Sequence, residues 1–529
     1  MEAKDLDQPN EAKELDLIKD TLELDVPWYH TRFMGRLLSA FFPPLGFLLL
    51  WTHPLRRRSR KILGTVLLAG YFVCWLAGLG ALGLQMGWFA LDWDGGDLPR
   101  LVLRRSGPNY QILEQDRTFQ AEERARKKAA FTNNVFAARA PYWTDFRGPK
   151  RDGHYDEEPI LTRWPARGLR QLWRYPCGGG YASFVVADGL AFTIEQRWDT
   201  EVVVAYDLAT GREVWTHAYT ARFYEWMGGE GPRATPTFYA DRVYSLGAQG
   251  DLLCLGARTG TLIWRRNVLE DTRSENLRYG LAASPIVVDE QLIVQGGQNG
   301  AEGTVAGYDV LTGDLLWTAL PEQLAYASPL RARLADTDCL MLVTATRVVG
   351  MNPADQTVLW ETPWAVRYGD ACCLPVIVDD RRFFLGGGYG AGSRVVEVRR
   401  EGTNLTTRVV WQNRNLRTKF NPAVYHEGHL YGLDEGVLTC VDATTGERCW
   451  RGGRFGYGQL LLASGELIVL GGNGRLALVE ATPEAYRALG SQQALHGKTW
   501  NVPALAHGRL LLRNSEEMVC YQIGKLVTR

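Results

Sequence analysis

Cations and aromatic side chains recur at one position of a repeated unit in this chain, directly before short motifs such as Thr-Pro, Ser-Pro and Asn-Pro. If that position lines a channel mouth, charge and ring stacking there can bind an anionic or sugar-like ligand. The opposing interpretation is that these side chains cap strand carbonyls and form ion pairs. The candidate ligand-binding residues are Arg233, Arg278, Tyr326, Tyr368, Lys419, Tyr457, Lys498 and Trp500, with Glu195 and Arg197 from the first unit.

Cys372 and Cys373 are adjacent, so they could form a vicinal disulfide. They stand where other units carry Ala-Ser-Pro or Ala-Thr-Pro, so two buried thiols at the start of a strand are the alternative. The nine cysteines are odd in number, and neither CxxC nor CxxCH occurs, so we expect no disulfide framework, zinc site or attached haem. No acidic cluster has the pattern of a calcium site. We therefore assign no catalytic residue and no metal ligand.

The charge balance argues against a nucleic-acid partner. The 59 basic and 59 acidic residues cancel, so no net field attracts a polyanion. The 57 glycines, 18 tryptophans and 22 tyrosines suit many short strands joined by tight turns.

The repeated unit places an apolar strand before Thr-Gly and a short strand ending in Trp after it, as in residues 202–215 and 438–450. Glycine supplies the positive φ of a tight hairpin turn, and each indole is expected to dock between neighbouring sheets. Because each unit also begins with a hairpin, the spacing predicts four-stranded antiparallel blades. The expected docking residues are Trp173, Trp215, Trp264, Trp317, Trp360, Trp411 and Trp450.

The two ends of the repeat region complement each other. A Trp-type strand at Leu172–Tyr175 precedes the first of eight hairpins, and the last copy lacks such a strand. The N-terminal strand can therefore complete the final blade and close the ring. We predict an all-β, eight-bladed propeller over 141–525. Seven blades is the alternative, because residues 480–496 are atypical and are expected to carry a helical insert.

These motifs carry a family likeness. The pattern Asp-x-x-Thr-Gly-x-x-x-Trp at 207–215, 309–317 and 442–450, with the opening WTDFRGPKRDG at 143–153, resembles pyrroloquinoline-quinone-like propellers. The resemblance implies either a quinoprotein dehydrogenase or a non-enzymatic scaffold such as the lipoprotein of the outer-membrane assembly machinery. In the alcohol-oxidising members a vicinal cysteine pair clasps the cofactor, which gives Cys372-Cys373 its interest.

Two apolar stretches precede the repeats, at 37–51 and 62–90. The second is long enough to cross a bilayer. The first either spans as well or, because of Pro43-Pro44, forms a re-entrant or interfacial segment. Five cations in 56–61 predict that this loop faces the cytoplasm and that everything after the second stretch faces the periplasm or cell exterior of a bacterium.

The predicted organisation is an acidic tail over 1–31, a membrane anchor over 32–91, a linker over 92–140 and the propeller. The linker is expected to contain a solvated spacer helix over 111–128, with a partner-binding coil as the alternative. The leading functional hypothesis is a non-enzymatic binding or assembly scaffold with a protein partner. The alternatives are an oxidoreductase using pyrroloquinoline quinone with calcium, and a small-ligand sensor.

Overall fold

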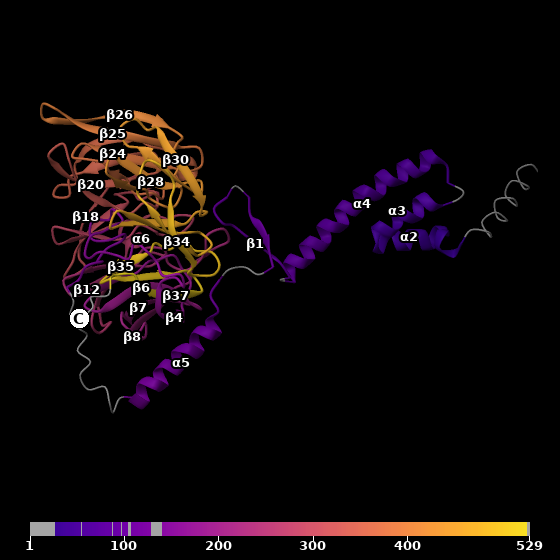
Figure 1. The fold of residues 1–529 in the computed structure, drawn as a ribbon, viewed down its shortest axis with the longest axis horizontal. Helices are drawn as coiled ribbons and strands as arrows, with labels where there is room; N and C mark the ends of the chain where they lie inside the picture. Colours follow the sequence, from indigo (N-terminus) through magenta and orange to yellow (C-terminus); the bar gives the residue numbers. More distant parts are fainter. Residues whose placement is uncertain are drawn as a thin grey trace, which may run out of the picture. The chain divides into compact units, whose positions relative to one another are not determined.

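The computed structural model describes residues 27–53, 56–86, 88–96, 98–103, 107–127 and 140–525. These belong to two compact units, one comprising residues 1–91 with 101–105 and the other comprising 92–100 with 106–529 (Figure 1). Most of the predicted acidic tail lies outside the described residues.

The first unit is helical. Its elements are η1 (Trp28–His30), α2 (Arg32–Phe41), α3 (Pro43–Thr52) and α4 (Arg58–Gln85). Helix α4 has the length and hydropathy needed to cross a membrane. Its start and end differ by a few residues from the predicted stretch of 62–90.

The stretch at 37–51 does not form a second spanning helix. It is divided at Phe42 between α2 and α3, because Pro43 can begin a helix but cannot continue one. Each piece has ten residues, or about 15 Å, against a hydrocarbon core of about 30 Å. The alternative of a re-entrant or interfacial segment is the one that these lengths fit.

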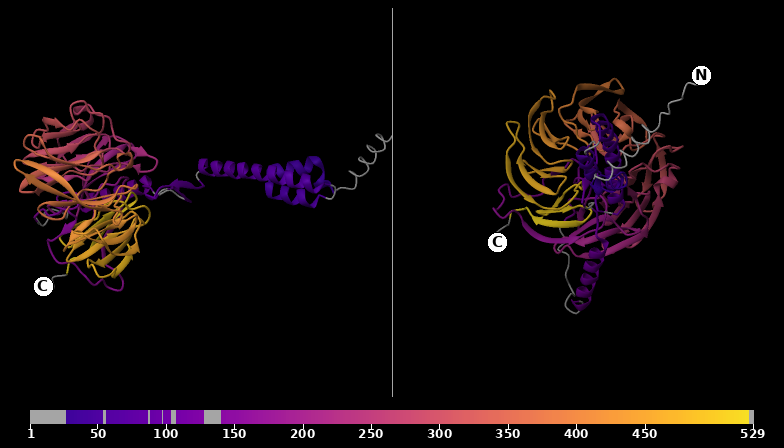
Figure 2. Two further views of the ribbon diagram at one scale, coloured as in Figure 1. Left: turned by 90° about the horizontal axis from the view of Figure 1, so that it is seen from above. Right: turned by 90° about the vertical axis from the view of Figure 1, so that its right-hand side faces the viewer.

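The second unit contains the predicted propeller, and its blades surround a central axis (Figure 2, right). Blade 1 consists of β5 (Val185–Ala187), β6 (Leu190–Arg197), β7 (Thr200–Asp207) and β8 (Glu213–Thr220), and blade 2 of β11 (Thr237–Tyr239), β12 (Arg242–Leu246), β13 (Asp251–Gly256) and β14 (Leu262–Asn267). Blade 3 consists of β15 (Ile286–Val288), β16 (Gln291–Gln295), β17 (Val305–Asp309) and β18 (Leu315–Ala319), and blade 4 of β19 (Leu330–Leu334), β20 (Thr337–Val343), β21 (Arg347–Met351) and β22 (Val358–Pro363).

Blade 5 consists of β23 (Val376–Ile377), β24 (Arg382–Gly387), β25 (Gly392–Glu401) and β26 (Asn404–Asn413), and blade 6 of β27 (Val424–His426), β28 (His429–Asp434), β29 (Val437–Asp442) and β30 (Arg448–Arg454). Blade 7 consists of β31 (Gln459–Ala463), β32 (Glu466–Leu470), β33 (Arg475–Glu480) and β34 (Ala488–Gln493). Blade 8 consists of β35 (Ala504–Ala506), β36 (Arg509–Arg513) and β37 (Glu517–Gln522), and β4 (Arg170–Pro176) from the start of the repeat region completes it. The smaller elements are β1 (Ala90–Asp92), β2 (Arg100–Val102), α5 (Tyr110–Lys127), β3 (His154–Tyr155), β9 (Tyr224–Glu225), β10 (Gly229–Glu230), α6 (Val268–Asp271) and η2 (Arg367–Gly369).

The ring closes as the sequence predicts, with eight blades. Strand β4 pairs antiparallel with β37, which sets Trp173 opposite Cys520. The innermost strands β35 and β5 then lie next to each other. The helical insert expected at 480–496 is wrong: residues 488–493 form β34, and no helix lies within 480–496. The carbonyl of Thr482 instead accepts a hydrogen bond from the Trp450 indole.

Most of the repeated tryptophans dock on the following blade. The Trp173 ring packs on Gly211, Trp215 on Gly260 and Trp264 on Gly313, so closely that a Cβ has no room there. In each case the glycine is the one in the Thr-Gly turn, and its φ is positive. The indole N–H of Trp173 also donates to the carbonyl of Leu208, at 3.2 Å. The turn glycine therefore serves both the hairpin and the contact between blades.

The blades that follow Trp317 and Trp360 lack a Thr-Gly turn, so these two rings find no turn glycine there. The rings pack instead on Gly307 and Gly350 of their own blades. Trp360 still contacts Phe383 of the next blade, at 5.3 Å between ring centroids. The Trp317 indole donates to the side chain of Gln291, at 2.6 Å.

Helix α5 covers the predicted spacer, but one face of it packs on the propeller. Leu113 and Gln120 are buried. Arg117 pairs with Glu213 of β8, at 3.1 Å, and donates to the carbonyl of Pro176, at 3.0 Å. The helix is thus a brace across blades 8 and 1 rather than a helix solvated on all sides.

Candidate functional site

A cavity of about 170 Å³ lies where the innermost strands of all eight blades begin. Each blade contributes at least one residue that directly precedes, begins or lies near its inner strand. The lining includes Tyr181, Arg233, Tyr279, Tyr326, Asp370, Cys372, Tyr389, Phe420, Gln459, Trp500 and Val502. The predicted ring of side chains at one channel mouth therefore has a geometric counterpart, and Arg233, Tyr326 and Trp500 lie in its wall.

The segment Trp143–Gly153 lies along the inner strands and contributes Phe146 to the same cavity. The amide of Val186 donates to the carbonyl of Trp143, and that of Phe238 to Thr144, both at 2.8 Å. The buried Arg151 donates to the carbonyl of Pro329, also at 2.8 Å. These bonds to separate blades hold the segment inside the ring.

Trp93 of the linker is inserted among the aromatic side chains of the mouth. It is 5% exposed and makes edge contacts with Phe420, at 5.7 Å between ring centroids, and with Trp500, at 5.6 Å. Its ring forms part of the cavity wall. The chain therefore fills part of its own channel mouth.

Two predicted lysines hold this linker segment. The Lys419 ammonium donates to the carbonyl of Gly95, at 2.6 Å, and lies over the rings of Tyr389, at 4.1 Å, and Tyr457, at 5.0 Å. The Lys498 ammonium lies 3.4 Å from the Asp92 carboxylate and donates to the Trp93 carbonyl, at 3.1 Å. Cation–π contact and charge-assisted hydrogen bonds thus fix the residues around Trp93.

Burial perturbs the acidic groups in and beside this cavity. It raises the pKa of Asp370 to about 6, although Arg278 and Lys419 oppose the shift. Cys372 and Cys373 are free thiols. Burial raises the pKa of Cys373 to about 11 and that of Cys372 well above its ordinary value. Thiols with raised pKa values are weak nucleophiles at neutral pH.

Glu195 and Arg197 lie apart from the cavity, in a buried ion-pair cluster. The Glu195 carboxylate pairs with Arg197, at 2.8 Å, and lies 3.8 Å from the buried Arg513 of blade 8. Burial alone would raise the pKa of Glu195, but Arg197, Arg513 and Arg117 reverse the shift and lower it. This cluster joins blades 1 and 8 with α5, so its geometry is that of a structural brace.

Tyr368 and Arg278 lie outside the cavity lining. Tyr368 is exposed, and Arg367 stacks on its ring at 4.8 Å. Arg278 is exposed and stacks on Tyr279, at 5.2 Å. Trp93 and Asp370 complete the site, and neither was a candidate in the sequence. Trp93 lies outside the repeat, and Asp370 lacks a counterpart in the other units.

The cavity does not fit a quinone cofactor while Trp93 stays in place. Its volume of about 170 Å³ is below the roughly 300–1,000 Å³ of pockets that hold drug-sized ligands. Within the part of the chain that the structure describes, no group of three His, Cys, Asp or Glu side chains could hold a metal ion.

Comparisons with known proteins agree with the propeller. The profile of the family described as outer membrane protein assembly factor BamB matches residues 199–452. A quinohemoprotein alcohol dehydrogenase of Comamonas testosteroni is 26% identical over 190 residues, which are 34% of this chain and 26% of that protein. Quinoprotein alcohol dehydrogenase PedH of Pseudomonas putida is 26% identical over 172 residues, 31% of this chain and 27% of that protein. The chain thus spans about a quarter of the length of these relatives.

Solved structures share the fold. A europium-containing methanol dehydrogenase superposes with a TM-score of 0.52 at 14% identity, over 72% of this chain and 90% of that one. Quinohemoprotein alcohol dehydrogenase ADHIIG of Pseudomonas putida HK5 gives a TM-score of 0.51 at 13% identity, over 74% and 81%. Repeat motif, blade geometry and sequence relatives together identify this ring as a pyrroloquinoline-quinone-like β-propeller.

Proposed function

We propose that this protein is a membrane-anchored, non-enzymatic scaffold whose propeller binds a protein partner outside the cytoplasm. The observation that carries the proposal is the occupied channel mouth: Trp93 and its neighbours take the space that a ligand would need. Binding then falls to the outer surface of the blades.

The outer surface carries apolar side chains suited to such a role. Leu262, Leu315 and Leu316 are exposed on β14 and β18, the edge strands of neighbouring blades. Leu311 is exposed in the turn before β18. An ion pair of 2.9 Å between Arg266 of β14 and Asp314 brings the two edges together. Contiguous exposed apolar side chains are typical of protein interaction sites, and edge strands offer unpaired backbone groups.

The anchor sets the side on which this surface acts. Helix α4 begins at Arg58, within the run of cations at 56–61, and the positive-inside rule assigns that end to the cytoplasm. The propeller follows the other end of the helix, so we assign it to the periplasm or cell exterior. A fusion of alkaline phosphatase to the C-terminus should be active, and an inactive fusion would contradict this sidedness.

Site-specific photo-crosslinking tests the scaffold proposal in intact membranes. A photo-reactive side chain at Leu316 should give a discrete crosslinked product with a protein. The same group at Leu489, exposed on β34 of blade 7, serves as the control and should not. Equal products from both positions, or none from Leu316, would count against a partner on these blades.

The sequence relatives named as alcohol dehydrogenases favour a second candidate, a quinoprotein oxidoreductase. That activity requires the linker to leave the mouth. Purified protein supplied with pyrroloquinoline quinone and Ca²⁺ would then retain the quinone and reduce a dye with alcohols or sugars. A third candidate is a small-ligand sensor. It predicts a rise in melting temperature when the ligand is added, and Arg233→Ala should abolish that rise.

A further inference from the structure

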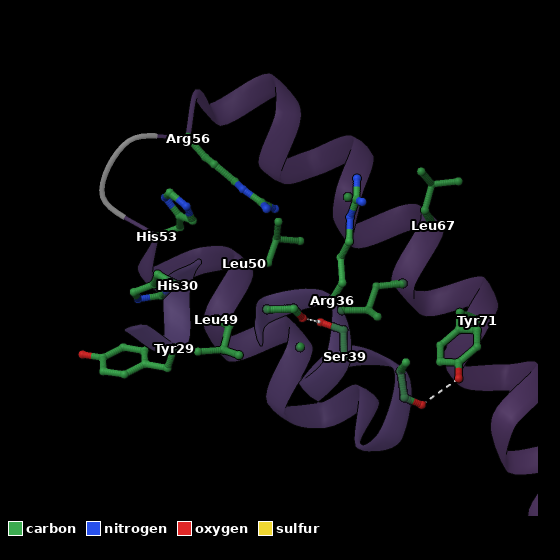
Figure 3. A pocket seen from close by; sticks show the side chains of 15 residues that line it. Tyr29, His30, Arg36, Ser39, Leu49, Leu50, His53, Arg56, Leu67 and Tyr71 are labelled. Carbon is green, nitrogen blue, oxygen red and sulfur yellow. Dashed lines mark hydrogen bonds between the residues drawn. The ribbon is translucent and has the colours of Figure 1, made fainter. Parts of the chain in front are cut away.

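The helical unit contains a second cavity, of about 370 Å³, between α2, α3 and α4 (Figure 3). Its lining residues come from η1, from both ends of α2 and α3, and from the first half of α4. Its polar lining includes His30, Arg36, Ser39, His53 and Arg56. Its apolar lining is formed by Leu49, Leu50, Leu67 and Leu68. The cavity thus combines cationic groups with a hydrocarbon wall.

The helices that form the cavity are fixed by specific bonds. The Trp51 indole of α3 donates to Thr65 of α4, at 2.9 Å. Tyr71 of α4 donates to the carbonyl of Ala40 in α2, at 2.7 Å. Gly46 lets α3 approach Ser39 and Leu68 more closely than a Cβ would allow. The cavity is therefore a built feature of the three-helix arrangement.

The charge around this cavity is entirely positive. Residues 27–91 contain no Asp or Glu, but they include seven cations, Arg32, Arg36, Arg56, Arg57, Arg58, Arg60 and Lys61. In Figure 3 the Arg36 and Arg56 side chains extend toward the space between the helices. Both residues are exposed, and within the described residues neither guanidinium makes an ion pair or a hydrogen bond. An anionic group would therefore neutralise the positive charge of this lining.

His30 adds an unpaired polar atom to the lining. Its side chain is 7% exposed, and its Nδ1 is buried without a hydrogen-bond partner in the described residues. Its Nε2 lies 3.3 Å from the Thr52 hydroxyl. An unsatisfied buried polar atom is costly, and a phosphate oxygen could accept a hydrogen bond from it.

We propose that this cavity binds an anionic phospholipid, with the headgroup phosphate between Arg36 and Arg56 and an acyl chain against Leu67 and Leu68. The inference rests on the membrane anchorage proposed above, which sets the cationic end of α4 at the cytoplasmic interface. Basic pockets between helices on that side suit anionic headgroups. The apolar wall favours a lipid over a free anion, because only a lipid buries hydrocarbon there.

Native mass spectrometry of the full-length protein in a non-ionic detergent tests the proposal. Phosphatidylglycerol should be retained in preference to phosphatidylcholine. R36Q/R56Q should weaken this retention by about 30-fold, from roughly 1 kcal/mol for each cation. R58Q/R60Q removes the same charge from residues outside the cavity and should have little effect. R36K/R56K keeps the charge and should largely preserve retention, which separates loss of charge from misfolding.

Equal losses in R36Q/R56Q and R58Q/R60Q would overturn the proposal, because they would show a diffuse surface charge. Displacement of phosphatidylglycerol by inorganic phosphate alone would overturn the assignment of a lipid. Fractionation of the same cells keeps the two proposals apart. A chain found in the membrane that retains no phosphatidylglycerol refutes the lipid site only, whereas a chain absent from the membrane refutes the anchor.

Discussion

Replacing Trp93 with Ala should open the channel mouth and expose Cys372 to thiol reagents. Trp93 and Cys372 line the same cavity, and Cys372 is a free thiol. In the wild-type protein Cys372 is only partly exposed, so we expect a bulky reagent to reach this thiol mainly when the linker segment leaves the mouth. The labelling rate then follows the population of the open form.

The size of the effect can be worked from the contacts of Trp93. Burial of a large apolar side chain contributes roughly 1.5–3 kcal/mol, and each aromatic pair about 0.5–1.5 kcal/mol more. With the two rings of Phe420 and Trp500 in contact, loss of the indole should cost the closed form about 3 kcal/mol or more. At 1.4 kcal/mol for each factor of ten, labelling should accelerate about 100-fold.

The assay is maleimide labelling followed by peptide mapping. The exposed Cys74 and Cys449 are replaced by Ser in every variant, so that they do not consume reagent. Trp88→Ala is the matched control, because Trp88 is an indole of the anchor segment that precedes the linker and is 58% exposed. Its labelling rate at Cys372 should equal that of the wild type. Equal rates for Trp93→Ala and the wild type would show that Trp93 does not close the mouth.

Three further predictions concern stability, each measured by urea unfolding. Trp173→Ala should destabilise the propeller by about 3–5 kcal/mol, because it empties the contact on Gly211; a change below about 1 kcal/mol would contradict its role in closing the ring. Glu195→Gln should cost about 3–5 kcal/mol at pH 7, because it leaves Arg513 buried without its charge partner. This cost should shrink as the pH falls through the lowered pKa of Glu195, and a cost independent of pH would argue against the ion pair. Burial raises the pKa of Asp370 to about 6 from 3.8, so the stability of the wild-type protein should fall as the pH rises from about 4 to about 6. Asp370→Asn should remove that fall and gain about 2–3 kcal/mol at pH 7. Identical pH profiles for the two proteins would refute the shift.

The blades were predictable because each repeats the same physical solution. The Thr-Gly turn and the terminal Trp act together: the glycine that permits the turn also leaves room for the indole of the preceding blade, as at Gly211 and Trp173. The unmatched strand at Leu172–Tyr175 made the ring closure predictable, since an unpaired strand and an incomplete blade need each other.

The segment at 480–496 shows where composition misleads. Its alanines and charges favour a helix in isolation, but Tyr486 packs on the Trp450 ring, at 6.0 Å, and Thr482 accepts the indole hydrogen bond. These tertiary contacts, together with pairing to β33, hold 488–493 as a strand.

The channel mouth was only partly predictable. Lys419, Lys498 and Trp500 could be placed there because they precede inner strands in a periodic pattern. Trp93 lies more than 40 residues before the first blade strand and belongs to no repeat, so nothing in the sequence tied it to this ring. The pattern predicted a ligand site, whereas the structure places a segment of the same chain within it.

Quinone titration of the intact wild-type protein tests the central claim most directly, namely that the ring acts as a scaffold with its mouth closed by the linker. Full-length protein incubated with pyrroloquinoline quinone and Ca²⁺, then passed through gel filtration, should carry no quinone absorbance and should reduce no dye with alcohols or sugars. Quinone that co-elutes in stoichiometric amount, with alcohol-dependent dye reduction, would contradict the account.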